Sequence, residues 1–118
     1  ARPAAFGQRP MGGKRPAILS AQARRDLAEA AAFIATDNPA AARRLREQVV
    51  AAAVRIGAYP RIGVVRPALA PEEVRFLVVP DFPYVIVYRA TATPPRILRV
   101  LHGARDLQEL LRDLLGGA

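Results

Sequence analysis

Two apolar stripes at helical spacing, separated by only three residues, constrain this chain more than any other feature. In residues 21–36 the apolar positions recur at intervals of four, three and four: Ala23, Leu27, Ala30 and Ile34. From residue 40 to about residue 59 the same spacing runs through Ala42, Leu45, Val49, Ala52 and Ile56. Such spacing places the side chains on one face of an amphipathic helix. Because the break at residues 37–39 is so short, the two helices must fold back as an antiparallel hairpin.

The sequence also carries signals for the ends of both helices. The side chain of Ser20 can accept a backbone hydrogen bond in the first turn of the first helix, and Asn38 can do the same for the second. Pro39 suits the first helical position, where a missing N–H does no harm. Gly57 and Pro60 are expected to end the second helix.

Three runs rich in β-branched and aromatic residues follow a loop at residues 61–71 and predict strands. Short breaks containing proline separate these runs, which favours antiparallel hairpins. The expected strands and last helix are Ala17–Leu19, Val74–Val79, Tyr84–Arg89, Arg96–His102 and Asp106–Leu115. The order β-α-α-β-β-β-α predicts an α+β fold, with the helical hairpin packed on one face of a small antiparallel sheet.

The last two strands predict a sheet that is apolar on both faces. Strict alternation would place the even-numbered side chains of residues 84–89 on one face and the odd-numbered ones on the other, and would do the same along residues 96–102. Neither strand is clearly polar on either side. Since one helical hairpin can cover only one face, the second face needs the terminal helix or a partner protein.

Length and composition fit one small domain. The chain has 118 residues and no cysteine, so it can form a single core but neither a disulfide nor a thiol nucleophile. We expect a disordered or non-native leader at residues 1–16 and one domain at residues 17–115. No apolar run approaches the roughly 20 residues needed to cross a bilayer. These features predict a cytoplasmic protein without membrane contact.

The net charge of +8 indicates a negatively charged partner. Seventeen of the eighteen basic residues are arginine, a bias that GC-rich coding would also produce. The excess of positive charge is the informative part. It fits a surface that faces either nucleic acid or an acidic protein.

Residues that support enzyme chemistry are sparse. The chain has one histidine, and it contains no glycine-rich phosphate loop, no histidine pair at metal spacing and no nucleophile elbow. We therefore expect neither a metal nor another cofactor. The carboxylates, Asp26 and Glu29 among them, are expected on helix surfaces as solvated ion pairs with nearby arginines.

The remaining candidates are four arginines near the predicted sheet and the single histidine. The arginines, which can bind phosphates or carboxylates or remain solvated surface charges, are Arg61, Arg75, Arg89 and Arg99. His102 can exchange a proton near neutral pH. Alternatively, it ends its strand held by hydrogen bonds to the backbone or to Asp106, which also caps the last helix. We favour this structural role, because no second titrating group is placed to work with the histidine.

Four stretches, in order, resemble the ParE branch of the RelE/ParE toxin superfamily. Residues 19–49 resemble the family's helical hairpin with its Asn-Pro junction, and residues 58–69 resemble its Pro-x-x-Gly loop followed by Arg-Pro. Residues 74–90 resemble a strand pair ending in Tyr-Arg, and residues 97–107 resemble a last strand ending in His-Gly-x-Arg-Asp. The resemblance covers about residues 17–107. The motif residues are Asn38, Pro39, Pro60, Gly63, Tyr88, His102, Gly103 and Asp106.

The resemblance implies a RelE/ParE fold and a type II toxin encoded beside a small antitoxin, ParD in this branch, that wraps the toxin. ParE toxins are associated with poisoning DNA gyrase, whereas the similar RelE toxins are ribosome-dependent mRNA endonucleases. Operator DNA would be contacted only through the antitoxin. The residues expected to bind the target or the antitoxin are Arg61, Arg75, Arg89, Arg99 and Arg105.

Three functions therefore remain open. The first is a gyrase inhibitor without catalysis, and the second is an mRNA endonuclease that uses Arg61, Arg75, Arg89 and His102. The third is an inactive toxin that acts only as a co-repressor with its antitoxin. The chain ends in LLRDLLGGA, without the C-terminal Tyr or His of the RelE branch, and this difference favours the gyrase inhibitor.

Overall fold

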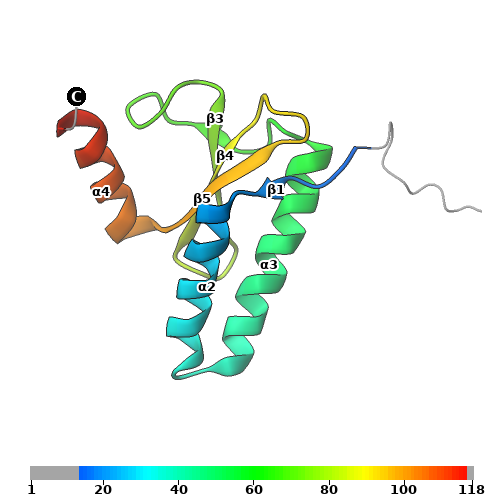
Figure 1. Cartoon of the computed structure of the whole chain (residues 1–118), viewed down its shortest axis with the longest axis vertical. Helices are drawn as coiled ribbons and strands as arrows, with labels where there is room; N and C mark the ends of the chain where they lie inside the picture. The colour runs from blue at the N-terminus through cyan, green and yellow to red at the C-terminus, as the bar shows by residue number, and fades with distance from the viewer. Residues whose placement is uncertain (1–13, 117–118) are drawn as a thin grey trace, which may run out of the picture.

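A helical hairpin dominates the computed structural model, which describes residues 14–116 and the side chains of residues 14–107, 109 and 110. Helix α2 (Ala21–Ala35) and helix α3 (Pro39–Ala58) run antiparallel and project below the sheet (Figure 1). The expected caps are present: Ser20 Oγ accepts from the Ala23 N–H at 3.0 Å, and Asn38 Oδ1 accepts from the Ala41 N–H at 3.0 Å. None of the described helices has the length and apolar character to cross a membrane.

The hairpin packs on a five-stranded sheet of order β1-β5-β4-β3-β2. The strands are β1 (Ile18–Leu19), β2 (Val64–Val65), β3 (Val74–Val78), β4 (Tyr84–Arg89) and β5 (Arg96–His102). Strands β2 to β5 pair antiparallel, while β1 runs parallel to β5. The predicted element order is therefore confirmed, with one addition. The two valines of β2 form an edge strand inside the stretch that we expected to be a loop.

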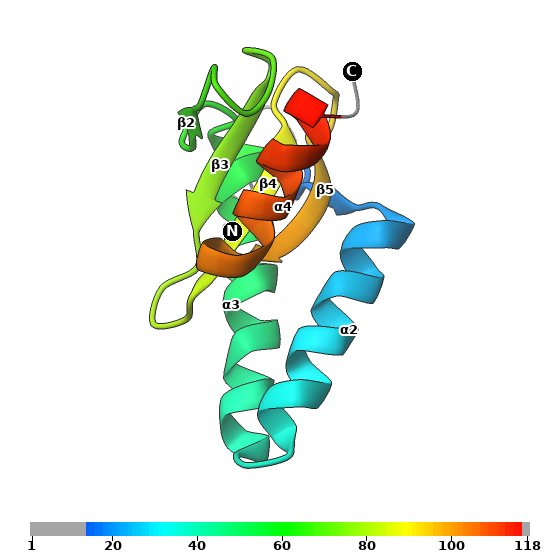
Figure 2. The same ribbon diagram turned by 90° about the vertical axis from the view of Figure 1, so that its left-hand side faces the viewer.

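Both faces of the sheet are covered, as the apolar strands predicted. The main core lies between the sheet and the α2–α3 hairpin, where Tyr84, Ile86 and Tyr88 meet the buried stripes of the helices. A smaller core on the other face contains Val85 and Val87 of β4. Helix α4 (Gly103–Gly116) lies over this second face (Figure 2) and contributes two partly buried leucines, Leu107 and Leu110, to its core.

The expected alternation holds along β4 but is wrong along β5. The pairing of β4 with β5 shifts register between Val87 and Tyr88, whose partners are Arg99 and Ile97. Leu98 is therefore an extra residue on β5, which is the definition of a β-bulge. As a consequence Ile97 and Val100 enter the same core, although their numbers differ in parity. Arg99, the residue after the bulge, pairs with Val87 of β4 and bonds to Asp26 of α2.

The end of α3 differs from the prediction in the role of Gly57. The helix continues through this residue to Ala58 rather than stopping at it. A Cβ atom at Gly57 would clash with the carbonyl oxygen of Arg15, so glycine is required for close packing against the preceding chain. Most of the expected leader lies outside the described residues. Its last part, residues 14–16, lies against this end of α3, where Lys14 Nζ donates to the Ala58 carbonyl at 3.0 Å.

Candidate functional site

Two of the candidate arginines meet at one end of the sheet. Arg61 and Arg75 line a hollow of about 670 Å³ whose other walls are Pro60, Val65, Glu72, Glu73, Ala90 and Thr91. Arg89 lies nearby in an exposed ion pair with Glu73, at 3.5 Å. Paired residues share a face of the sheet, so Arg89 lies on the same face as its partner Val74. Arg75 pairs with Tyr88 and lies on the opposite face. The structure thus brings Arg61 and Arg75 together and leaves Arg89 on the other side of the sheet.

The loop that carries Arg61 is held rigidly by a buried tyrosine. Tyr88 is fully buried, and its hydroxyl accepts from the Gly63 N–H at 2.8 Å and donates to the Pro60 carbonyl at 2.7 Å. Burial raises the pKa of Tyr88 above its ordinary value, so the phenol keeps the proton that it donates. Arg75 adds a bond of 2.8 Å from Nη1 to the Gly63 carbonyl. The tyrosine of the Tyr-Arg motif therefore anchors the Pro-x-x-Gly loop, with Arg75 as a second contact.

Replacing Tyr88 with phenylalanine is expected to lower the free energy of unfolding by about 2 kcal/mol, because a buried N–H and a carbonyl lose their partner. Urea denaturation of the purified protein measures the change. The matched control is Tyr59→Phe, since Tyr59 is 69% exposed and should tolerate the loss of its hydroxyl. Equal stability of the two variants would contradict the anchoring role of Tyr88.

The single histidine lies at the opposite end of the sheet and helps to begin α4. His102 Nδ1 accepts from the backbone N–H of Arg105 at 3.3 Å, and Asp106 Oδ2 accepts from the His102 N–H at 2.7 Å. Burial raises the pKa of Asp106, but hydrogen bonds from Arg105 and the His102 backbone outweigh burial and hold it below the ordinary carboxyl value. The helix consequently begins at Gly103, three residues before the predicted start. These bonds match the structural role expected for His102.

The two ends of the sheet are too far apart to form one catalytic site. His102 pairs with Tyr84 at the first residue of β4, whereas Arg89 is the last residue of that strand. At about 3.3 Å per residue, these positions are separated by roughly 17 Å. A general acid or base must lie within hydrogen-bond reach of the reacting group. Arg61, Arg75, Arg89 and His102 therefore do not converge on one substrate atom.

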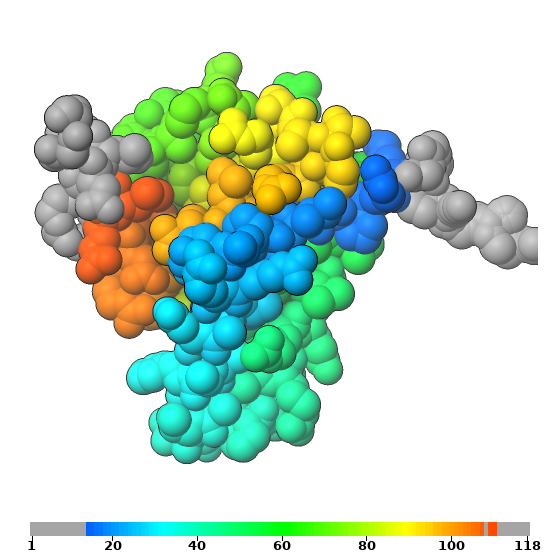
Figure 3. Space-filling model, viewed as in Figure 1, coloured from blue at the N-terminus to red at the C-terminus, as the bar shows by residue number. Residues whose placement is uncertain are grey.

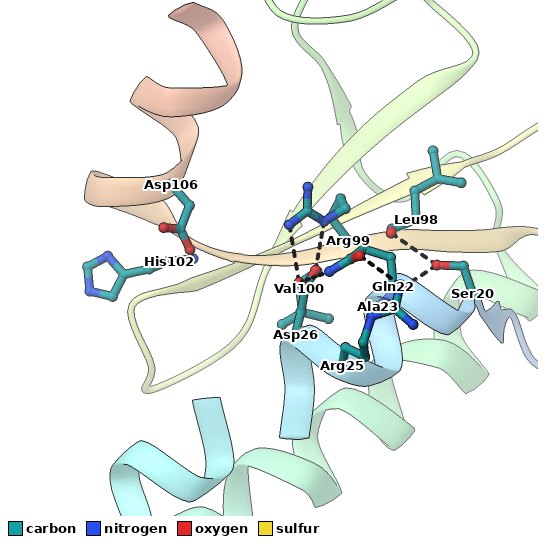
Figure 4. Close-up of polar contacts among 10 residues, drawn as sticks. All are labelled: Ser20, Gln22, Ala23, Arg25, Asp26, Leu98, Arg99, Val100, His102 and Asp106. Atoms are coloured by element: carbon teal, nitrogen blue, oxygen red, sulfur yellow. Dashed lines mark hydrogen bonds and ion pairs between the residues drawn. The ribbon is translucent and has the colours of Figure 1, made fainter. Parts of the chain in front are cut away.

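Arg99 has an internal partner that the sequence reasoning missed. Its guanidinium donates from Nε and Nη2 to the two carboxylate oxygens of Asp26, at 2.8 and 3.2 Å (Figure 4). The same carboxylate accepts from the Val100 N–H at 2.9 Å and from Gln22 Nε2 at 2.9 Å. The side chain of Asp26 is only 7% exposed. Our expectation of a solvated surface carboxylate was wrong for this residue.

The electrostatics of Asp26 are those of a carboxylate held in its charged form. Burial raises its pKa, but hydrogen bonds from Arg99, Gln22 and Val100 more than compensate, and the resulting pKa lies below 3.8. A signal for this role was present in the sequence. Asp26 lies three residues after Ala23 and four before Ala30, so it belongs to the buried stripe of α2.

Comparison with known proteins agrees with this architecture. A family model described as the ParE toxin of the type II toxin–antitoxin system parDE matches residues 17–107. Among solved structures, a chain from the "Chromosomal ParDE TA system from P. aeruginosa" is similar, with a TM-score of 0.64 and 20% sequence identity. That match covers 75% of this chain and 96% of the other. No curated protein matches. Because the family model spans most of the sequence, the chain belongs to the ParE toxin family of type II toxin–antitoxin systems.

Proposed function

We propose that this toxin arrests growth by binding DNA gyrase in the cytoplasm, without catalysis, and that a ParD-like antitoxin neutralises it. The observation that carries the proposal is the roughly 17 Å that separate His102 from Arg89 along β4. The residues expected to act as a nuclease site are divided between the two ends of the sheet. Inhibition by binding requires an exposed contact surface. It does not require catalytic side chains that converge on one substrate atom.

The anchored loop offers such a surface. Tyr59 is 69% exposed and Ile62 is 40% exposed, and the side chain of Arg61 is exposed between them. Tyrosine and arginine are enriched among residues that dominate binding at protein interfaces. Because Tyr88 and Arg75 already hold the loop backbone, little conformational entropy is lost on binding. We therefore assign contact with the target to residues 59–64.

A supercoiling assay with purified gyrase tests the proposal. The toxin is expected to inhibit supercoiling, and Arg61→Ala is expected to weaken the inhibition by about tenfold, as loss of an interface anchor does. Arg25→Ala, which removes an exposed arginine from α2, is the matched control and should inhibit as the unaltered protein does. Supercoiling that stays unaffected over a wide range of toxin concentrations would refute gyrase as the target.

The mRNA endonuclease is the second candidate, because Arg61 and Arg75, a residue type that can bind phosphate, line one hollow. We expect translated mRNA to stay intact while the toxin arrests growth. Cleavage in the ribosomal A site that disappears in Arg61→Ala would replace the gyrase proposal. Normal growth during expression of the toxin alone would instead favour the inactive co-repressor.

A further inference from the structure

Two exposed arginines lie directly opposite each other on neighbouring strands. Arg89, the last residue of β4, pairs with Arg96, the first residue of β5. In an antiparallel pair the Cβ atoms of such residues are about 5 Å apart, and like charges at these positions destabilise a sheet. Both side chains are exposed. The pair therefore does not serve the stability of the free protein.

The chain itself neutralises this pair only in part. Arg89 Nη1 lies 3.5 Å from Glu73 Oε2, in an ion pair whose two side chains are 44% and 42% exposed. Ion pairs with such exposure contribute little to stability. Within the part of the chain that the structure describes, Arg96 forms no ion pair. Its positive charge therefore has no counter-charge among these residues.

A third arginine lies on the same face of the sheet. Arg66 Cζ lies 5.6 Å from the centre of the Phe76 ring, which is a cation–π contact. Phe76 alternates along β3 with Val74, the partner of Arg89, and both belong to the smaller core. Arg66 is itself exposed. We call Arg66, Arg89 and Arg96 the arginine face.

Charge is segregated along the sheet. The loop at residues 61–72 and the turn at residues 90–95 flank the arginine face and form the upper end of the molecule in Figure 3. The hollows at the opposite end of the sheet contain two arginines, Arg99 and Arg105, and four carboxylates, those of Asp26, Glu29, Asp106 and Glu109. A charge distribution of this kind orients an approaching polyanion toward the arginine face.

We propose that Arg66, Arg89 and Arg96 bind the phosphate backbone of duplex DNA. Guanidinium groups donate paired hydrogen bonds to phosphates, and a phosphate between Arg89 and Arg96 would relieve their mutual repulsion. Backbone contacts carry no sequence information, so this surface differs from operator recognition, which we expect of the antitoxin.

The inference goes beyond the proposed function and can be tested without gyrase. Gyrase acts on duplex DNA. A toxin that contacts the enzyme through residues 59–64 would use the arginine face, at the same end of its sheet, to hold the DNA beside the enzyme.

Other ligands match the arginine face less well. Single strands are held largely by stacking on exposed aromatic rings. Phe76 is only 2% exposed, and the exposed Tyr59 follows α3, which packs on the opposite face of the sheet. A protein partner favours an apolar centre in its interface, whereas protein–DNA interfaces are polar and positively charged. A second copy of this chain would place arginines against arginines, which opposes association.

Fluorescence anisotropy of a labelled DNA duplex of arbitrary sequence tests the proposal. The full chain is titrated at salt concentrations between about 50 and 200 mM, and Kd is expected to rise steeply with salt. Arg89→Thr and Arg96→Thr should each weaken binding and reduce the slope of log Kd against log salt by about one, as loss of one phosphate contact does. Arg25→Ala removes the same charge from an exposed position of α2 and should leave the slope unchanged.

Thermal melts of the same variants give a second readout. Arg96→Thr removes the like-charge contact and introduces a residue that favours strands, so its Tm should equal or exceed that of the unaltered protein. A clearly lower Tm would show that Arg96 stabilises the fold, and would contradict its assignment as a binding residue.

The outcomes separate this surface from the proposed function. Absence of duplex binding at about 50 mM salt would overturn the inference and leave the gyrase proposal standing. Equal weakening in Arg25→Ala would also overturn it, because net charge and not a defined surface would then explain the binding. DNA binding through the arginine face without inhibition of supercoiling would refute the proposed function alone.

Two further measurements test the choice of ligand. Tighter binding to an RNA duplex or to single-stranded DNA would overturn the assignment of duplex DNA. The assignment would also fall if Arg89→Thr and Arg96→Thr weakened binding to the purified antitoxin and left DNA binding unchanged.

Discussion

Replacing Asp26 with alanine is expected to lower the free energy of unfolding by about 3 kcal/mol, which is a large share of the stability of a small domain. The substitution removes the partner of the Val100 N–H and leaves the Arg99 guanidinium without its carboxylate. A buried unpaired amide accounts for part of the loss, and the lost charge-assisted bonds account for the rest. Urea denaturation monitored by circular dichroism measures the change.

The matched control is Glu29→Ala, which removes an exposed carboxylate three residues further along the same helix. We expect its effect to stay within about 0.5 kcal/mol, as is usual for surface substitutions. A loss of similar size in both variants would show that the acidic charge of α2, rather than the buried network, stabilises the fold.

The same carboxylate predicts how stability depends on pH. Because the pKa of Asp26 is lower in the folded protein than the ordinary 3.8, its charged form stabilises the fold fully at pH values above 3.8. This contribution is lost as the pH falls through the lower folded value. Asp26→Asn should therefore flatten part of the decline in stability below about pH 4. The pKa of Asp106 is also lowered in the folded protein. Part of the decline in stability should therefore remain in Asp26→Asn.

Gly63→Ala is expected to destabilise the fold by about 3 kcal/mol, the upper range for overpacking of a rigid site. The added Cβ would lie 2.8 Å from the Tyr88 hydroxyl and 2.9 Å from the Phe76 carbonyl oxygen. Neither group can withdraw, because Tyr88 is fully buried and the carbonyl belongs to the backbone of β3. The loop must then leave its anchor. Urea denaturation gives the loss of stability.

Gly103→Ala provides the comparison, since its added Cβ would meet the nearest atom at an ordinary 3.5 Å. This glycine occupies the first turn of α4, where alanine has the higher helix propensity. We expect unchanged or slightly higher stability. A similar loss at both glycines would mean that the close approach to Tyr88 is not the cause.

The parts of the fold that depend on local patterns were predictable from the sequence. The caps at Ser20 and Asn38, and the bounds of β4 and β5, follow from side-chain types and from periods of 3.6 and 2 residues. The anchoring of Gly63 by Tyr88 joins residues 25 positions apart and could not be derived from spacing. The resemblance to ParE toxins marked both residues without showing that they touch.

The candidate site was harder to predict, because a charged side chain is defined by partners that are distant in the sequence. Arg99 was expected to be available for a ligand, yet it binds Asp26, 73 residues away. That pairing joins α2 to β5, so local spacing does not identify the partner. The position of Asp26 on an apolar stripe was the usable signal. A carboxylate at such a position needs an internal counter-charge.

Ser20, Asp26 and Asp106 each bond to a backbone group of β5. Strand β1 extends along β5 only as far as Ile97. Beyond that point the Leu98 carbonyl, the Val100 N–H and the His102 N–H are occupied by Ser20, Asp26 and Asp106. An incoming strand would therefore meet three backbone groups that are already bonded. Three short polar side chains thus block this edge of the sheet, which disfavours edge-to-edge aggregation of the toxin when its antitoxin is absent.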